Sequence, residues 1–166
     1  MSIDFLKRLL LFFGLLLAQV LVLNHVHLFG VAIPLLYVYF VLSFPRDYSR
    51  NGALVWSFLL GLFIDIFSNT PGVAAFSMTL VAVLQPYVLR LFIQRDNDDN
   101  IQPSIFALGI NKYTLYALIL IFVYCLTFFT METFTFFNFG KWFLSVVGST
   151  TLTLFMVVVI DNLRKD

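Results

Sequence analysis

The sequence predicts an all-α, polytopic membrane protein whose six transmembrane helices form a single integral membrane domain over residues 1–166. The first observation is composition, because 61% of the residues are hydrophobic and 11% are charged, whereas soluble domains carry about 25% charged residues. The second is that the apolar residues come in long runs, and a helix of about 20 residues crosses roughly 30 Å of hydrocarbon. The third is that these runs lack the alternating pattern of a β-barrel, which leaves helices as the spanning elements.

The six apolar runs are bounded by polar or turn residues. The first follows Lys7 and Arg8 as in a signal peptide, but no small-residue cleavage site comes after it, so we expect an uncleaved span. The second and third runs are short, and the fourth contains Pro86, which is expected to free a backbone carbonyl and kink its helix. The expected spans are about 5–24, 28–44, 52–68, 72–92, 112–132 and 140–160.

The basic residues predict the orientation of these spans. If all six cross and the N-terminus is cytoplasmic, only Lys141 of the ten Lys and Arg residues lies outside. The positive-inside rule then favours an N-in, C-in topology. The loop 93–111 would face inward, and we expect a short interfacial helix in it, capped by Ser104. A docking surface for a cytoplasmic partner is the alternative for this loop.

Asp65 is the most unusual residue, because it lies inside the apolar run 59–67, directly before the turn sequence Ser68–Gly72. An ionisable side chain near lipid costs roughly 2–4 kcal/mol, so it persists mainly where it has a partner or a task. One role is structural: the carboxylate accepts hydrogen bonds from free N–H groups at 72–74, where the next helix begins. The other role is functional, as part of an outward-facing polar pocket or contact patch.

Glu132 is a second acid about one turn before the end of its span, and Lys141 is expected to neutralise it. Small residues at a spacing of four mark three helix faces that allow close approach in lipid, one of them Ser145, Ser149 and Thr153 on the sixth span. Gly14 and Ala18 lie on the first span, and Ala53, Ser57 and Gly61 lie on the third. These faces are expected to pack within the bundle, or, most readily on the first span, against a partner's transmembrane helix.

No residue pattern predicts catalysis or a cofactor. His25 and His27 stand two apart with no Cys, Asp or Glu near them, whereas a metal site needs three or four ligands. The single Cys125 cannot form an internal disulfide, and no nucleophile triad, phosphate loop or CxxC motif occurs. A net charge of +1 without a basic stripe excludes nucleic acid as the expected partner. We expect a protein that is not an enzyme and holds no metal or cofactor, with membrane lipid around it.

The string Gly61-x3-Asp65-x2-Ser68-x2-Pro71-Gly72, at the end of the third span, resembles the signature of the MreD family of rod shape-determining membrane proteins. The sequence Met131-Glu132-Thr133-Phe134 at the end of the fifth span resembles that family's Leu-Glu-x-Phe. The short length, the six expected spans and the basic tail are also similar.

The resemblance implies an inner-membrane scaffold of the bacterial cell-wall elongation machinery. It implies binding to MreC, a single-span protein, and through MreC an indirect link to MreB, to RodA and to a class B penicillin-binding protein. It also implies no enzyme activity, and a fold like the six-helix substrate-binding component of energy-coupling-factor transporters. Two other hypotheses remain open: a component that binds a small, vitamin-type solute for transport, and a membrane-embedded lipid enzyme using Asp65 and Glu132.

Overall fold

The computed structural model describes residues 2–21, 34–44, 48–93, 103–133 and 139–164, and every regular element within them is an α-helix. Four helices, α3, α4, α6 and α7, are long and apolar enough to cross a membrane. The prediction of an all-helical membrane protein is therefore confirmed at this level, and these four correspond to the last four predicted spans. The helices are α1 (Ser2–Leu21), α2 (Val38–Leu42), α3 (Arg50–Ser68), α4 (Val73–Phe92), α5 (Ile105–Leu108), α6 (Ile110–Thr133) and α7 (Phe139–Arg164).

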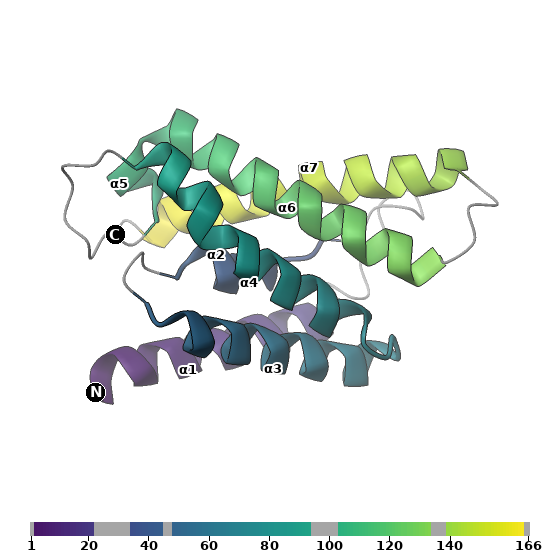
Figure 1. The fold of residues 1–166 in the computed structure, drawn as a ribbon, viewed down its shortest axis with the longest axis horizontal. Coiled ribbons are helices and arrows are strands. Elements are labelled where there is room, and N and C mark those ends of the chain that lie inside the picture. The colour runs from purple at the N-terminus through teal and green to yellow at the C-terminus, as the bar shows by residue number, and fades with distance from the viewer. Residues whose placement is uncertain (1, 22–33, 45–47, 94–102, 134–138, 165–166) are drawn as a thin grey trace.

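The long helices run roughly side by side (Figure 1). Helix α3 packs against both α1 and α4, and α6 packs against both α4 and α7. Helix α4 thus joins an α1–α3 layer to an α6–α7 layer, and α2 lies between the layers in the middle of the molecule. Large apolar side chains remain exposed on all the long helices, as expected where lipid is the solvent.

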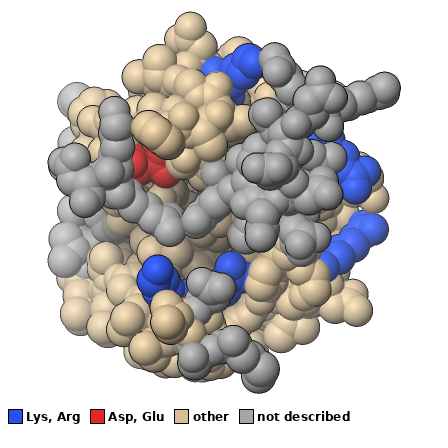
Figure 2. All heavy atoms as spheres, turned by 90° about the vertical axis from the view of Figure 1, so that its left-hand side faces the viewer, with Lys and Arg blue, Asp and Glu red and all other residues tan. Residues whose placement is uncertain are grey.

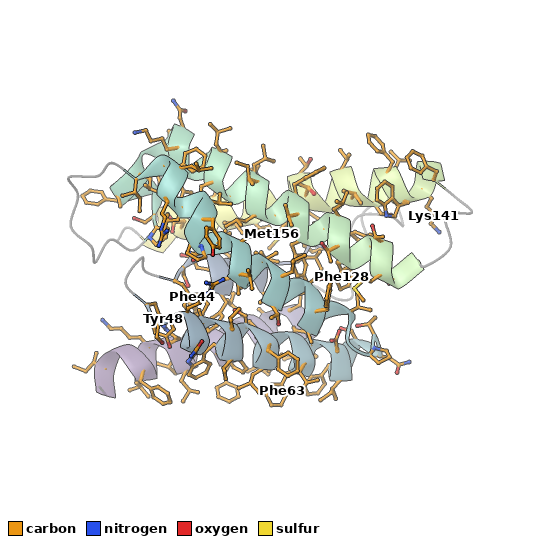
Figure 3. The ribbon with its side chains drawn as sticks, viewed as in Figure 1. Phe44, Tyr48, Phe63, Phe128, Lys141 and Met156 are labelled. Carbon is orange, nitrogen blue, oxygen red and sulfur yellow. The ribbon has the colours of Figure 1, made fainter. Side chains whose placement is uncertain are left out.

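The bundle has two chemically different ends. Lys7, Arg8, Arg50, Arg90 and Lys112 lie near the helix ends that meet at one end of the molecule, where the chain also begins and α7 finishes. We call it the basic end, and Figure 2 looks onto it. Lys141, near the start of α7, lies at the opposite end of the molecule (Figure 3). The α3–α4 turn is at this end too, so we call it the turn end. The predicted orientation requires Lys141 to lie at the opposite end from the other cations, and the described cations are separated in this way.

Helix α1 covers the first predicted span, although it begins three residues earlier, at Ser2. One face is buried, with Phe12 at its centre. The Phe12 ring makes edge-on contacts with Phe40, Trp56 and Phe63 at centroid distances of 5.9, 5.6 and 6.0 Å. These contacts join α1 to α2 and α3. The opposite face of α1 exposes apolar side chains along its whole length: Ile3, Leu6, Leu10, Phe13, Leu17 and Leu21.

The second predicted span, 28–44, is not a continuous helix. Within its described part, residues 34–44, only Val38–Leu42 is helical, and the residues before it form turns. All eleven residues of this part are buried, and the five of α2 are at most 1% exposed. The described part of the apolar run that predicted a second span therefore belongs to a segment enclosed by the other helices. Hydrophobicity alone does not distinguish these two environments.

Side chains from four long helices bind the backbone at both ends of this enclosed segment. At its start, the Gln19 amide donates to the Pro34 carbonyl at 2.9 Å and accepts from Leu36 N–H at 3.0 Å. The Thr153 hydroxyl of α7 accepts from Leu35 N–H at 3.0 Å. At its end, Gln85 donates to the Phe44 carbonyl at 3.1 Å, and the Tyr116 hydroxyl donates to the Leu42 carbonyl at 3.2 Å. Non-helical backbone at membrane depth is tolerated where protein satisfies it in this way.

Replacing Gln19 with leucine is expected to destabilise the fold, because one amide satisfies two buried backbone groups. Leaving both without a partner costs about 2 kcal/mol or more, at roughly 1–3 kcal/mol for each. Unfolding of the purified protein in a detergent–denaturant titration measures this loss. Asn111→Leu, at an exposed amide on α6, is the control and should change little. Equal stability of the two variants would show that Gln19 does not hold this segment.

The short helix predicted in the 93–111 loop is confirmed as α5. Its N-cap is Ser104, as expected, and the Ser104 hydroxyl accepts from Ala107 N–H at 3.1 Å. The helix ends at Gly109, whose φ of +85° is a conformation that glycine adopts at no steric cost. Residues 94–102, with the polar cluster of this loop, lie outside the described residues, so the alternative of a docking surface stays a prediction.

Candidate functional site

The motif singled out in the sequence forms the turn between α3 and α4 at the turn end of the bundle. Asp65 lies one turn before α3 ends, and its side chain is only 3% exposed. One carboxylate oxygen accepts from Ala74 N–H at 2.8 Å and the other from Ala75 N–H at 2.9 Å. The first oxygen also accepts from the Thr70 hydroxyl at 2.9 Å. Asp65 thus caps the start of α4, which is the structural role predicted for it, shifted one residue along the helix.

Asp65 supplies the N-terminal cap of α4, because the residue at the N-cap position cannot do so. The N-cap residue of α4 is Gly72, which has no side chain to accept from the first N–H groups of the helix. Helix N-termini leave such groups unsatisfied and carry positive partial charge, so a buried carboxylate there gains both hydrogen bonds and favourable electrostatics. The backbone carbonyl of Asp65 also accepts from the N–H groups of Asn69 and Thr70. Asp65 therefore stabilises both the end of α3, through its backbone carbonyl, and the start of α4, through its carboxylate.

Two residues of the turn adopt left-handed backbone conformations that allow the chain to reverse tightly. Asn69 has φ +58° and Gly72 has φ +80°, and Asn and Gly are the residues that tolerate this region best. Pro71 lies between them and is exposed, and Ser68 is half-buried at the last position of α3. These residues shape the turn that brings the start of α4 over Asp65.

Gly61 lies one helical turn before Asp65, at the closest approach of α3 and α4. A Cβ atom there would lie 2.6 Å from the Cα atom of Ala75, and 2.7 and 2.8 Å from the carbonyl oxygen and carbon of Ala74. All three atoms belong to backbone, which cannot move aside as a flexible side chain can. Gly61 therefore permits the close helix packing that places the Ala74 and Ala75 N–H groups within reach of Asp65.

Glu132 does not join this arrangement. It lies at the end of α6, and its side chain is exposed. Among the described residues, the predicted ion pair between Glu132 and Lys141 is not formed, nor does a hydrogen bond join Glu132 to Asp65. The two acids that the sequence suggested as members of one outward pocket thus have different environments, one enclosed and one open.

The small-residue faces of α3 and α1 also differ. On α3, Ala53 is half-buried and Ser57 is fully buried, and within the described residues the Ser57 hydroxyl has no hydrogen-bond partner. This face is packed inside the bundle, which is the first of the two roles predicted for it. On α1, Gly14 is exposed and Ala18 is half-buried, and a Cβ atom at Gly14 would have no neighbour within 4 Å. The Gly14 face is therefore not used for packing by the described part of the chain.

Asp161 is a second buried acid, for which the sequence predicted no role. It is 4% exposed near the end of α7, where it accepts from the Tyr39 hydroxyl at 3.0 Å and from Ile105 N–H at 2.7 Å. It thereby joins α7 to the second residue of α2 and to the first residue of α5. The signal that identified Asp65 is also present here, since Asp161 directly follows the apolar run 154–160.

The described residues contain no group of three or more His, Cys, Asp or Glu side chains that could hold a metal ion. His25 and His27 lie outside the described residues. Cys125 is fully buried on α6. Among the side chains that the structure describes, the two buried carboxylates, Asp65 and Asp161, both accept hydrogen bonds from backbone N–H groups and hydroxyls. The arrangement is therefore one of helix capping and close packing. No family model, curated protein or solved structure matches the chain.

Proposed function

We propose that this chain is a non-enzymatic scaffold of the bacterial cell-wall elongation machinery, of the MreD type, and that it binds MreC in the inner membrane. The observation that carries the proposal is the state of the motif that resembles the family. Gly61 and Asp65 together fix the α3–α4 hairpin, and both carboxylate oxygens of Asp65 are occupied. A motif that builds a rigid hairpin supports a scaffold better than it supports an enzyme, which needs an available reactive group.

We also propose that the chain crosses the membrane six times with both termini in the cytoplasm, in a fold like the energy-coupling-factor component. Helix α1 has 20 residues, which is long enough to cross roughly 30 Å. It begins at the same end of the molecule as α3, so the chain between them must return along the bundle (Figure 1). The enclosed segment 34–44 is part of this return. The described cations at the basic end agree with a cytoplasmic location for that end.

The exposed face of α1 is the proposed contact with the transmembrane helix of MreC. Lipid accounts for exposed leucine and phenylalanine, so the specific feature of this face is Gly14, where backbone is open to close approach. Because α1 packs on α3, the α3–α4 hairpin that Asp65 stabilises also supports α1 in the position in which it would contact MreC. Contact with MreC would link the protein indirectly to MreB, RodA and a class B penicillin-binding protein.

Replacing Gly14 with leucine is expected to lower the recovery of co-expressed MreC about tenfold, which corresponds to roughly 1.4 kcal/mol of lost binding. The bulk blocks close helix approach, while the thermal unfolding of the protein itself stays unchanged because no neighbour lies within 4 Å. Gly140→Leu is a matched control, since Gly140 on α7 is also exposed and has no neighbour within 4 Å.

The possible outcomes test the α1 contact surface and the scaffold proposal separately. Full MreC recovery with Gly14→Leu would show that the α1 face is not the contact surface. Absence of MreC from purifications of the unaltered chain, expressed with the MreC of the same organism, would contradict the scaffold proposal itself. Asp65 variants are less informative here, because loss of the fold would remove MreC for an indirect reason.

A further inference from the structure

A cavity of about 180 Å³ lies at the basic end of the bundle, far from the α3–α4 turn. Cavities of about 150 Å³ are large enough to take up a six-carbon ring. This cavity lies between the first turn of α3, the second half of α4 and two aromatic residues that come after α2, Phe44 and Tyr48 (Figure 3). The lining residues are Phe44, Tyr48, Arg50, Ala53, Ala82, Gln85, Pro86, Tyr87 and Arg90.

The charged side chains in the described lining of this cavity are of one sign. Two of the lining side chains, Arg50 and Arg90, are cations, and the described lining includes no Asp or Glu. A third guanidinium, that of Arg8, packs on two of the lining rings, with its Cζ atom 3.8 Å from the Tyr48 ring centre and 5.0 Å from that of Phe44. Its buried Nη1 has no hydrogen-bond partner among the described residues. Three guanidinium groups without a described acid beside them create a site that attracts an anion.

The backbone adds to this positive potential. Helix α3 begins at Arg50, and its N-cap residue Ser49 makes no side-chain hydrogen bond to the first turn. The N–H groups of residues 50–52 have no acceptor among the described residues, and with the positive end of the helix dipole they lie beside the cavity. The amide of Gln85 already donates to the Phe44 carbonyl and the Tyr116 hydroxyl, so it fixes the inner wall. The donors available to an incoming group are those of the arginines, the Tyr48 hydroxyl and the α3 terminus.

We propose that this cavity binds the phosphate group of an anionic ligand, with Arg50 and Arg90 as its principal partners. Arginine pairs with phosphate in a bidentate geometry, which suits two guanidinium groups on one cavity. Two sources offer this chemistry: the headgroup of an anionic phospholipid and a soluble phosphate ester. The site favours the lipid, because Tyr87 and Leu91 beside Arg90 are 50% and 77% exposed on α4 and offer an apolar surface for acyl chains. Basic cavities between membrane helices recognise anionic headgroups in this way.

The test uses the full-length protein in a neutral detergent. Native mass spectrometry counts bound molecules during titrations with phosphatidylglycerol, with phosphatidylcholine and with soluble glycerol phosphate. We expect one phosphatidylglycerol to remain bound at concentrations at which phosphatidylcholine is lost, with affinities differing by about tenfold or more. This selectivity needs no variant, so it is independent of any effect of mutation on folding. Glycerol phosphate binding as well as phosphatidylglycerol would support the phosphate site and assign it to a soluble ester.

Variants locate the site. The double variant Arg50→Gln/Arg90→Gln removes the charges, and Ala53→Leu fills the cavity while leaving the charges in place. Each is expected to weaken phosphatidylglycerol binding about tenfold or more. Lys112→Gln is the matched control, because Lys112 is an exposed cation at the same end on α6 and does not line the cavity. Equal binding by the double variant and the control, or equal retention of both lipids by the unaltered protein, would overturn the proposal. The proposal does not depend on the assignment to the elongation machinery.

Discussion

Replacing Asp65 with alanine is expected to lower the free energy of unfolding by about 3 kcal/mol or more. The change removes three hydrogen bonds and leaves the buried N–H groups of Ala74 and Ala75 without an acceptor, at roughly 1–3 kcal/mol for each group. The free energy of unfolding of Asp65→Asn should lie between those of the unaltered protein and Asp65→Ala. The amide keeps one acceptor oxygen but presents a donor to the other N–H group. Hydrogen exchange at Ala74 and Ala75 should accelerate before exchange elsewhere in α4.

Glu132→Ala provides the matched control for Asp65→Ala. Both substitutions remove an acid near the turn end, but Glu132 is exposed and caps no described helix. Its loss should change the unfolding free energy by a few tenths of a kcal/mol, as is usual for surface positions. If the two variants unfold at the same denaturant concentration, Asp65 is not the residue that fixes the hairpin, and the structural explanation of the motif is wrong.

Replacing Gly61 with alanine is expected to destabilise the protein by about 2 kcal/mol, although alanine is the better helix former by roughly 1 kcal/mol. The added methyl group would lie 2.6–2.8 Å from backbone atoms of Ala74 and Ala75, so α3 and α4 must separate, and overpacking of this kind costs about 1–3 kcal/mol or more. Gly14→Ala is the control, because that Cβ meets nothing within 4 Å. Gly14→Ala should leave stability unchanged or raise it slightly.

The two large effects should not add. Gly61→Ala displaces the same two residues whose N–H groups bind Asp65, so it already weakens the cap that Asp65→Ala removes. In a double-mutant cycle, the combined variant is expected to lose less stability than the sum of the single variants, by about 1 kcal/mol. Additivity within the experimental error would mean that Gly61 and Asp65 act independently, against the coupling that their shared neighbours imply.

Local sequence signals predicted several features correctly. The ends of the last four spans agree with α3, α4, α6 and α7 to within a few residues, because turn residues and charges mark them in the sequence. The cap of α5 by Ser104 followed from residue type and position alone. Asp65 also had a readable signal, since an acid in an apolar run must have a partner, and the nearest free donors were at the start of the following helix.

Other features depend on contacts between distant segments and left no local signal. The run 28–44 reads as a span, yet its described part is an enclosed segment with one short helix, bound by Gln19, Gln85, Tyr116 and Thr153 from elsewhere in the chain. The difference between Gly14 and Gly61 was likewise invisible. Both are glycines on small-residue faces, and only the position of α4 makes one indispensable and leaves the other open.

The sequence by itself predicted that lipid surrounds most of the chain, that the chain is helical, that the cations are segregated and that Asp65 needs a partner. These features follow from composition, from the pattern of apolar residues and from residue type. Tertiary structure alone decided which apolar run is enclosed, which glycine permits close packing, and that the basic end contains a cavity. The physical reason is that the hydrophobicity of a side chain favours its removal from water but does not specify whether lipid or protein surrounds it. Lipid and protein satisfy an apolar side chain equally well, so the choice between them is made by the polar groups that a segment must pair across the bundle.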